Sequence, residues 1–332
     1  MPSLPKPRFV RTTRGRGAVS PAVAEPEASQ IEVAEAAGIR WVNIEQPRHA
    51  HRAWLEERFD FHPLDYEDVF SRNQRPKIDE YDSYLFIVLY FPRFDKHVGR
   101  LNAAELDLFI GPDFLVTLPN APLQPVEYLF ERCRANDELR AQWFSKGTGY
   151  LLYKIIDACV DASFPMLAKM GNKLERVEDE IFAGRSKEVV RDISNVKQEI
   201  INFRKVVRPQ RAVFGDLERT KQRYLAEDLD VYFDDINDAS ERVWQMLETY
   251  KETVEALEAT NESVLTHQLN DVLRVLTVLS LVFLPLTLIA SVFGMNVHVP
   301  GEQHEVPFWI IIGVMVAIGA GMIAFFRRRR WL

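Results

Sequence analysis

The chain has 332 residues, two cysteines and a formal net charge of −7. Cys133 and Cys159 lie far apart without a nearby Cys or His, which argues against a disulfide framework and against a zinc-finger site. Residues 1–28 carry five basic and two acidic side chains, residues 294–305 carry two glutamates, and four arginines lie near the C-terminus. Residues 29–274 therefore hold a net charge of −12. Such an acidic body argues against nucleic-acid binding and favours a cationic partner.

The N-terminal part predicts a tail followed by a small α/β domain. Residues 1–28 are rich in Pro, Arg, Ala and Ser, so we expect disorder there, and they lack the apolar stretch of a secretory signal. Residues 29–125 mix strand and helix patterns with an antiparallel component. Strand patterns lie at Arg40–Ile44, Ser83–Phe91, Glu105–Ile110 and Phe114–Leu118, and helix patterns at Ala50–Phe59 and Pro63–Phe70.

Residues 126–234 predict a helical cytoplasmic region, because strand patterns stop after Pro125. Helical periodicity covers Glu127–Asp137, Tyr150–Phe182 and Glu188–Thr220. Pro209 lies inside the last of these and predicts a kink.

A long stalk helix is predicted over residues 235–274. Its seam alternates steps of four and three residues: Val243, Leu247, Tyr250, Val254, Leu257, Asn261, Val264 and Gln268. This spacing is typical of helices that pack lengthwise. Neither Pro nor Gly interrupts Asp235–Leu284, so one helix of roughly 90 Å should run on to Phe293. We expect a helix of this length to pack against copies of itself.

Two apolar runs without charged residues close the chain, Val275–Phe293 and Val306–Phe326. Each is long enough to cross a hydrocarbon core of roughly 30 Å as one helix. Residues 294–305 form the outer loop between them, and residues 327–332 form a basic tail. Because arginines favour the cytoplasmic side, we predict a cell (inner or plasma) membrane protein with both termini in the cytoplasm. The fold class is thus an α+β cytoplasmic domain, then long helices and a two-helix transmembrane hairpin.

The first membrane helix carries a second seam, shifted by one residue from the first. Its members are Asn270, Leu273, Thr277, Ser280, Leu284, Thr287 and Ser291. Hydroxyl groups on one face of a membrane helix have two interpretations, contact with another helix or the lining of a water-filled pore. Asn270 and Asn296 bracket the stripe with carboxamides. Amide and hydroxyl oxygens without a carboxylate suit a cation that keeps its water shell, such as Mg2+.

The sequence Gly294-Met295-Asn296, directly after the first of two C-terminal spans, resembles the signature of the CorA family of magnesium transporters. The whole helix from Asn270, with Pro285-Leu286-Thr287, also resembles the family's first membrane helix. In the soluble part the resemblance rests on four short segments, His62-Pro63-Leu64, Glu67-Asp68, Gln74-Arg75-Pro76-Lys77 and Tyr84–Tyr90. It covers roughly residues 35–332.

This resemblance implies a funnel-shaped homopentameric channel in the lipid bilayer, with Gly294, Met295 and Asn296 as the selectivity filter. Five residues of the second seam match pore-lining positions, namely Asn270, Leu273, Leu284, Thr287 and Ser291, and Thr277 and Ser280 join them because they lie on the same seam. Leu273 and Leu284 would form the hydrophobic constriction. Asp95 and Asp235 look similar to the family's inter-subunit sites, where bound Mg2+ holds the closed state. Mg2+ would then be both the substrate and the regulatory ligand, with no other cofactor.

The outer loop departs from the family pattern, because Val299-Pro300-Gly301-Glu302 stands where close relatives carry Met-Pro-Glu-Leu. Glu302 still falls where a carboxylate would attract cations, and Glu305 adds a second. His298 and His304 could bind zinc, so zinc remains an alternative substrate.

The predicted function is passive entry of Mg2+, and also of Co2+ and Ni2+, into the cytoplasm. A zinc transporter of the ZntB type and a membrane-anchored coiled-coil scaffold without transport are the alternatives. We expect no enzymatic activity, because the sequence shows neither a nucleophile–base pair nor a phosphate-binding loop.

Overall fold

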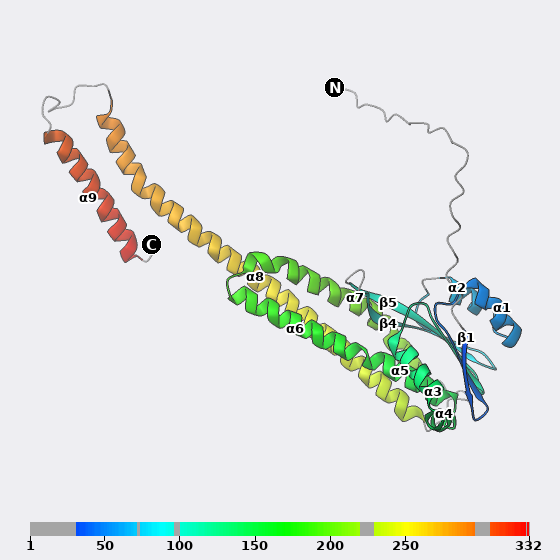
Figure 1. The fold of residues 1–332 in the computed structure, drawn as a ribbon. Helices are drawn as coiled ribbons and strands as arrows, with labels where there is room; N and C mark the ends of the chain where they lie inside the picture. Colours follow the sequence, from blue (N-terminus) through cyan, green and yellow to red (C-terminus); the bar gives the residue numbers. More distant parts are fainter. Residues whose placement is uncertain are drawn as a thin grey trace, which may run out of the picture.

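The structure is a computed structural model that describes residues 31–71, 74–95, 100–219, 229–295, 306–329 and 331. The tail expected in residues 1–28 lies outside these described residues. Figure 1 shows an α/β body from which one helix, α8 (Asp230–Phe293), extends away and is joined at its far end by α9 (Val306–Arg328). The soluble α/β part followed by a long helix and a C-terminal apolar helix confirms the predicted fold class.

The α/β part is built on one mixed six-stranded sheet with the order β1-β2-β6-β5-β4-β3. The strands are β1 (Ile31–Ala36), β2 (Ile39–Ile44), β3 (Lys77–Glu80), β4 (Leu85–Asp95), β5 (Arg100–Ile110) and β6 (Phe114–Pro119). All neighbours pair antiparallel except β2 and β6, which are parallel. The four expected strands and the antiparallel component are confirmed, whereas β1 and β3 were not predicted.

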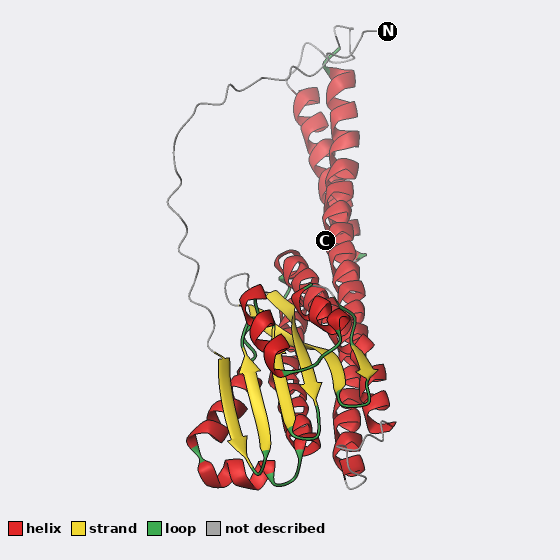
Figure 2. Cartoon of the chain, turned by 90° about the vertical axis from the view of Figure 1, so that its right-hand side faces the viewer, coloured by secondary structure: helices red, strands yellow, loops and turns green. Residues whose placement is uncertain are grey.

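Each face of the sheet has its own hydrophobic core. Figure 2 shows the helices that lie around the strands. The short helices α1 (His49–Arg58) and α2 (Pro63–Phe70) lie on one face, where Phe61 stacks on Phe109 with ring centroids 4.0 Å apart. The other face packs against α3 (Gln124–Ala135) and α5 (Thr148–Asp161), with Trp41 edge-on to Phe130 at 5.0 Å. Alternating side chains of each strand supply the two cores.

The expected helices at Glu127–Asp137 and Tyr150–Phe182 are each divided in two. Asn136 is extended and its side chain accepts the Leu139 N–H at 2.9 Å, so it ends α3 and caps α4 (Asp137–Phe144). The second break falls at Ala162, between α5 and α6 (Ser163–Phe182). Pro165 explains it, because a proline has no N–H to donate and is tolerated only in the first turn of a helix.

Three long helices, α6, α7 (Ser186–Arg219) and α8, pack lengthwise (Figure 1). Val243, Leu247, Val254 and Leu257 of the predicted seam are buried there. Ion pairs add to the contact, with Lys197 Nζ 2.6 Å from Glu258 and Arg204 Nη2 2.6 Å from Glu248. Lengthwise packing is therefore confirmed, and α6 and α7 of the same chain cover the buried part of the seam. The expected packing against copies of the chain stays a prediction.

Candidate transmembrane ion pathway

Two helices are long and apolar enough to cross a membrane, α8 and residues Phe308–Arg328 of α9. Only 11% and 6% of their most apolar windows are buried within the chain. A core helix of a soluble protein would bury such a surface, because exposed apolar area is unfavourable in water. The exposed apolar surface of both helices is instead the kind that lipid covers.

One face of α8 packs against α9. Val278 and Val282 are buried with Phe326 of α9, and Leu286 and Met322 pack around them. Val278, Val282 and Leu286 follow steps of four residues and so lie on one side of the helix. This contact defines which side of α8 faces its neighbour in the chain.

The seven residues of the second seam lie on the other side of α8, and all are exposed. At 3.6 residues per turn, six of them lie about 120–180° around the helix from Val278 and Val282, and Asn270 lies about 100° away. The two leucines of this face, Leu273 and Leu284, are 50% and 68% exposed. The structure therefore brings the predicted pore-lining residues together as one face that α9 leaves free.

Three of the four hydroxyl groups on this face donate to their own helix. Thr277 Oγ1 donates to the Leu273 carbonyl at 2.7 Å, Ser280 Oγ to Leu276 at 2.9 Å, and Thr287 Oγ1 to Phe283 at 2.5 Å. The donated proton satisfies the hydroxyl within the helix, while the oxygen keeps acceptor capacity toward the outside. A row of acceptors of this kind can receive hydrogen bonds from the water shell of a cation or from another helix.

The C-terminal end of α8 is Phe293. Gly294 follows as its C-cap, with its N–H 2.9 Å from the Ala290 carbonyl, and Met295 is 59% exposed. The rest of the predicted mouth lies outside the described residues: Asn296, His298, Glu302, His304 and Glu305.

The two predicted regulatory aspartates have different neighbours within one chain. Asp95 ends β4, with Arg93 Nη2 3.5 Å from its carboxylate. Asp235 is exposed near the start of α8, close to Tyr153 and Asp157. Burial raises the pKa of Asp157, and the charges of Asp161 and Asp235 raise it further. Among the described residues of one chain, no three His, Cys, Asp or Glu side chains form a metal-holding group.

Residues 36–328 match the family described as CorA-like Mg2+ transporter protein. The chain belongs to this family. The cobalt/magnesium transport protein CorA of Thermotoga maritima is 29% identical over 297 residues, which cover 88% of this chain and 83% of that protein. This CorA-family chain is thus a divalent cation transporter of the membrane.

Solved structures show the same fold. The complete CorA magnesium transporter of Methanocaldococcus jannaschii superposes with a TM-score of 0.81 at 21% identity, over 94% of this chain and 96% of that one. The full-length CmaX protein gives a TM-score of 0.70 at 19% identity, over 88% and 89%. The long helix and the C-terminal apolar helix of this CorA-family chain therefore belong to a known architecture.

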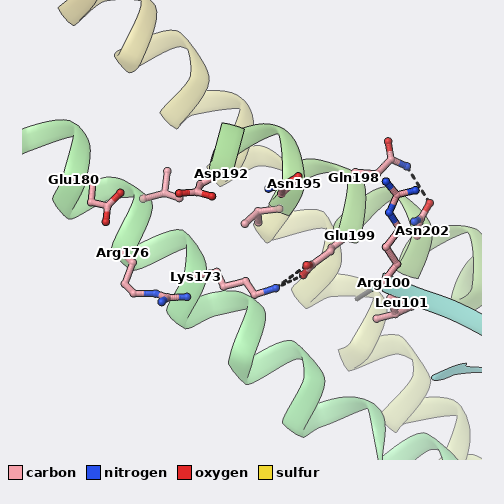
Figure 3. Close-up of a pocket in the computed structure, with 12 residues that line it drawn as sticks. Arg100, Leu101, Lys173, Arg176, Glu180, Asp192, Asn195, Gln198, Glu199 and Asn202 are labelled. Carbon is pink, nitrogen blue, oxygen red and sulfur yellow. Dashed lines mark hydrogen bonds and ion pairs between the residues drawn. The ribbon is translucent and has the colours of Figure 1, made fainter. Parts of the chain in front are cut away.

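The CorA-family chain also has a polar groove that its sequence did not predict, of about 380 Å³ between α6 and α7. In Figure 3, Lys173 of α6 reaches across it to Glu199 of α7, at 2.6 Å, and Gln198 donates to Asn202 at 3.0 Å. Its charged side chains are three basic and three acidic: Arg100, Lys173, Arg176, Glu180, Asp192 and Glu199. This balance gives the groove no preference for ions of either sign.

Proposed function

We propose that this chain forms a homopentameric channel that carries hydrated Mg2+ into the cytoplasm across the inner or plasma membrane, with both termini cytoplasmic. The observation that carries the proposal is the exposed face of α8 opposite Val278 and Val282. In a ring of copies with α9 on the lipid side, this face would point to the central axis. Its hydroxyl oxygens would then line a continuous path.

The chemistry of this face suits a hydrated divalent cation. Mg2+ loses its water reluctantly, and hydroxyl or amide oxygens can accept hydrogen bonds from that water without replacing it. We assign the selectivity filter to Gly294, Met295 and Asn296, and the attraction of cations to Glu302 and Glu305. Leu273 and Leu284 would form apolar constrictions, which close a pore by excluding water.

The proposed gate depends on the acidic side chains of the cytoplasmic part. Asp95 and Asp235 of neighbouring copies would bind Mg2+ together, because bound cations relieve the repulsion between carboxylates. A high cytoplasmic Mg2+ concentration would then hold the copies in a closed arrangement. The T. maritima relative is named for both cobalt and magnesium transport, so we extend the proposed substrates to Co2+. The entry of Ni2+ stays a prediction from the family resemblance.

Ion flux into liposomes that contain the purified protein tests the proposal. We expect Mg2+ to enter when the inside is negative, because each charge gains about 2.3 kcal/mol per 100 mV. Asn296→Ala should abolish this entry, while size measurements still give the wild-type oligomer. Wild-type flux in Asn296→Ala would refute the filter assignment. Zn2+ entry that needs a proton gradient, without Mg2+ entry, would identify a zinc transporter, and the absence of any flux would contradict the proposed channel.

A further inference from the structure

The cytoplasmic end of α9 gathers arginines and aromatic rings. Arg327 and Arg328 form the last turn of the helix, Arg329 follows, and all three side chains are exposed. They lie directly beyond Phe326, the residue that packs on α8, so they are at the level of Val278, near the start of the apolar part of α8. The positive charges therefore stand at the edge of the hydrocarbon-covered surface.

Aromatic contacts order this end of the chain. The backbone N–H of Trp331 donates to the Phe326 carbonyl at 3.0 Å, and the Trp331 and Phe326 rings lie against each other with centroids 5.8 Å apart. The Arg329 guanidinium lies over the Phe325 ring at 5.9 Å from its centroid. Trp331 stays 44% exposed. A half-exposed tryptophan beside arginines is typical of the headgroup level of a bilayer, because its ring is both apolar and polar.

Charge partners for these arginines are missing from the part of the chain that the structure describes. Arg327, Arg328 and Arg329 form no ion pair with a described carboxylate. Asp271, which lies seven residues before Val278 on α8, is 3.3 Å from Arg274 instead. This is notable in a chain whose body carries −12 and whose other arginines commonly pair, as Arg204 does with Glu248. Three uncompensated cations beside an apolar surface attract an anionic ligand from that surface.

We propose that Arg327, Arg328, Arg329 and Trp331 form a site for the headgroup of an anionic phospholipid in the cytoplasmic leaflet. The guanidinium group suits this ligand, because its fork of N–H donors matches the oxygens of a phosphate diester better than an ammonium does. The acyl chains would lie along the exposed apolar surface of α9. The bound lipid would hold α9, and through Phe326 it would steady α8 in the membrane.

Lipid retention by the purified full-length protein tests the site and does not require ion transport, so its failure is distinct from failure of the proposed channel. The protein is incubated with equal amounts of phosphatidylglycerol and phosphatidylcholine in detergent, and bound lipid is measured by native mass spectrometry. We expect the wild type to prefer phosphatidylglycerol and this preference to fall at high salt. Arg327→Gln/Arg328→Gln/Arg329→Gln should lose it, by about fivefold per arginine.

A matched control removes the same charge elsewhere. Arg185→Gln/Lys187→Gln/Arg191→Gln changes three exposed basic residues near the α6–α7 connection and should keep the preference. The single variant Arg328→Gln leaves enough arginines for membrane orientation and should lose about fivefold. Equal retention of the two lipids by the wild type would overturn the proposal. An unchanged preference in the α9 triple variant would overturn it as well, because the lipid would then bind elsewhere on the protein.

Discussion

Val278 of α8 and Phe326 of α9 bury each other, at 3% and 7% exposure, in a region where nearly all other side chains face outward. Lipid is as apolar as a leucine side chain, so burial between membrane helices depends on close packing rather than on escape from water. The pair therefore fixes how α9 lies against α8. It also decides which face of α8 remains free for other copies or for ions.

Phe326→Ala should loosen the α8–α9 hairpin. We expect a loss of about 1–2 kcal/mol, less than the 3–5 kcal/mol of a water-soluble core, because lipid or detergent solvates the exposed surface nearly as well. Thermal unfolding in detergent measures the change. Phe325→Ala is the matched control, because Phe325 is the next residue and is 56% exposed. Equal losses in the two variants would contradict the assigned packing.

Leu284→Ala should increase Mg2+ flux in liposomes at low cytoplasmic Mg2+. Leu284 lies on the face opposite α9, and a smaller side chain widens an apolar constriction and lets water enter it more easily. Leu279→Ala is the comparison, because Leu279 is also exposed, 53% against 68%, but lies about 140° around the helix from Leu284. If both variants conduct alike, the assigned pore face is wrong.

The sequence allowed the course of α8 to be predicted, but not its partners. Proline and glycine are absent from Asp235–Leu284, so a continuous helix followed directly, and the structure begins it at Asp230. A seam of four and three steps indicates lengthwise packing without saying which helix covers it, and α6 and α7 of the same chain do so. The strands β1 and β3 escaped prediction because β1 contains Glu and Ala, and β3 has four residues, three of them charged.

For the candidate ion pathway, too, the sequence predicted one part and not another. Spacing placed Thr277, Ser280 and Thr287 on one face of α8, and the structure shows that face free. The contact between α8 and α9 on the opposite side of α8 could not be predicted. The helix α9 is apolar on all sides, so its sequence singles out no packing face. Whether the free face meets water or other helices depends on copies of the chain, so the pore assignment stays a prediction.

Asp107→Asn should stabilise the α/β domain at neutral pH. Asp107 of β5 is fully buried and its Oδ1 has no hydrogen-bond partner among the described residues. Burial raises the pKa of Asp107 well above its usual range, and the nearby Glu105 and Asp68 carboxylates raise it further, against the effect of Lys77. The uncharged amide removes the penalty of ionising this site. We expect a gain of about 1 kcal/mol, or roughly 2–4 °C in melting temperature.

The pH dependence gives the sign of this effect. The folded domain keeps a proton on Asp107 that the unfolded chain releases above pH about 4, so folding takes up a proton. Stability should therefore fall as the pH rises from about 4 toward the raised pKa, and Asp107→Asn should flatten this slope. Melting curves of the full-length protein between pH 5 and about 8 measure it. Asp82→Asn, at an exposed aspartate, should leave the slope unchanged, and a wild-type slope in Asp107→Asn would contradict the assignment.

Asp235→Asn should weaken the control of the channel by Mg2+. Asp235 is exposed on α8 near Asp157, and the described residues of one chain form no group of three metal ligands there, so a neighbouring copy would supply the rest. Removing one carboxylate lowers the affinity of such a site, because Mg2+ prefers charged oxygen ligands. Mg2+ bound between copies should slow cleavage by trypsin, because it would hold the copies in the closed arrangement. We expect Asp235→Asn to need about tenfold more Mg2+ for the same protection from trypsin. Asp238→Asn, one turn further along α8, is the control with the same loss of charge. If Asp235→Asn shifts the protecting concentration no more than Asp238→Asn does, the protection comes from general screening of the acidic body and not from a site at Asp235.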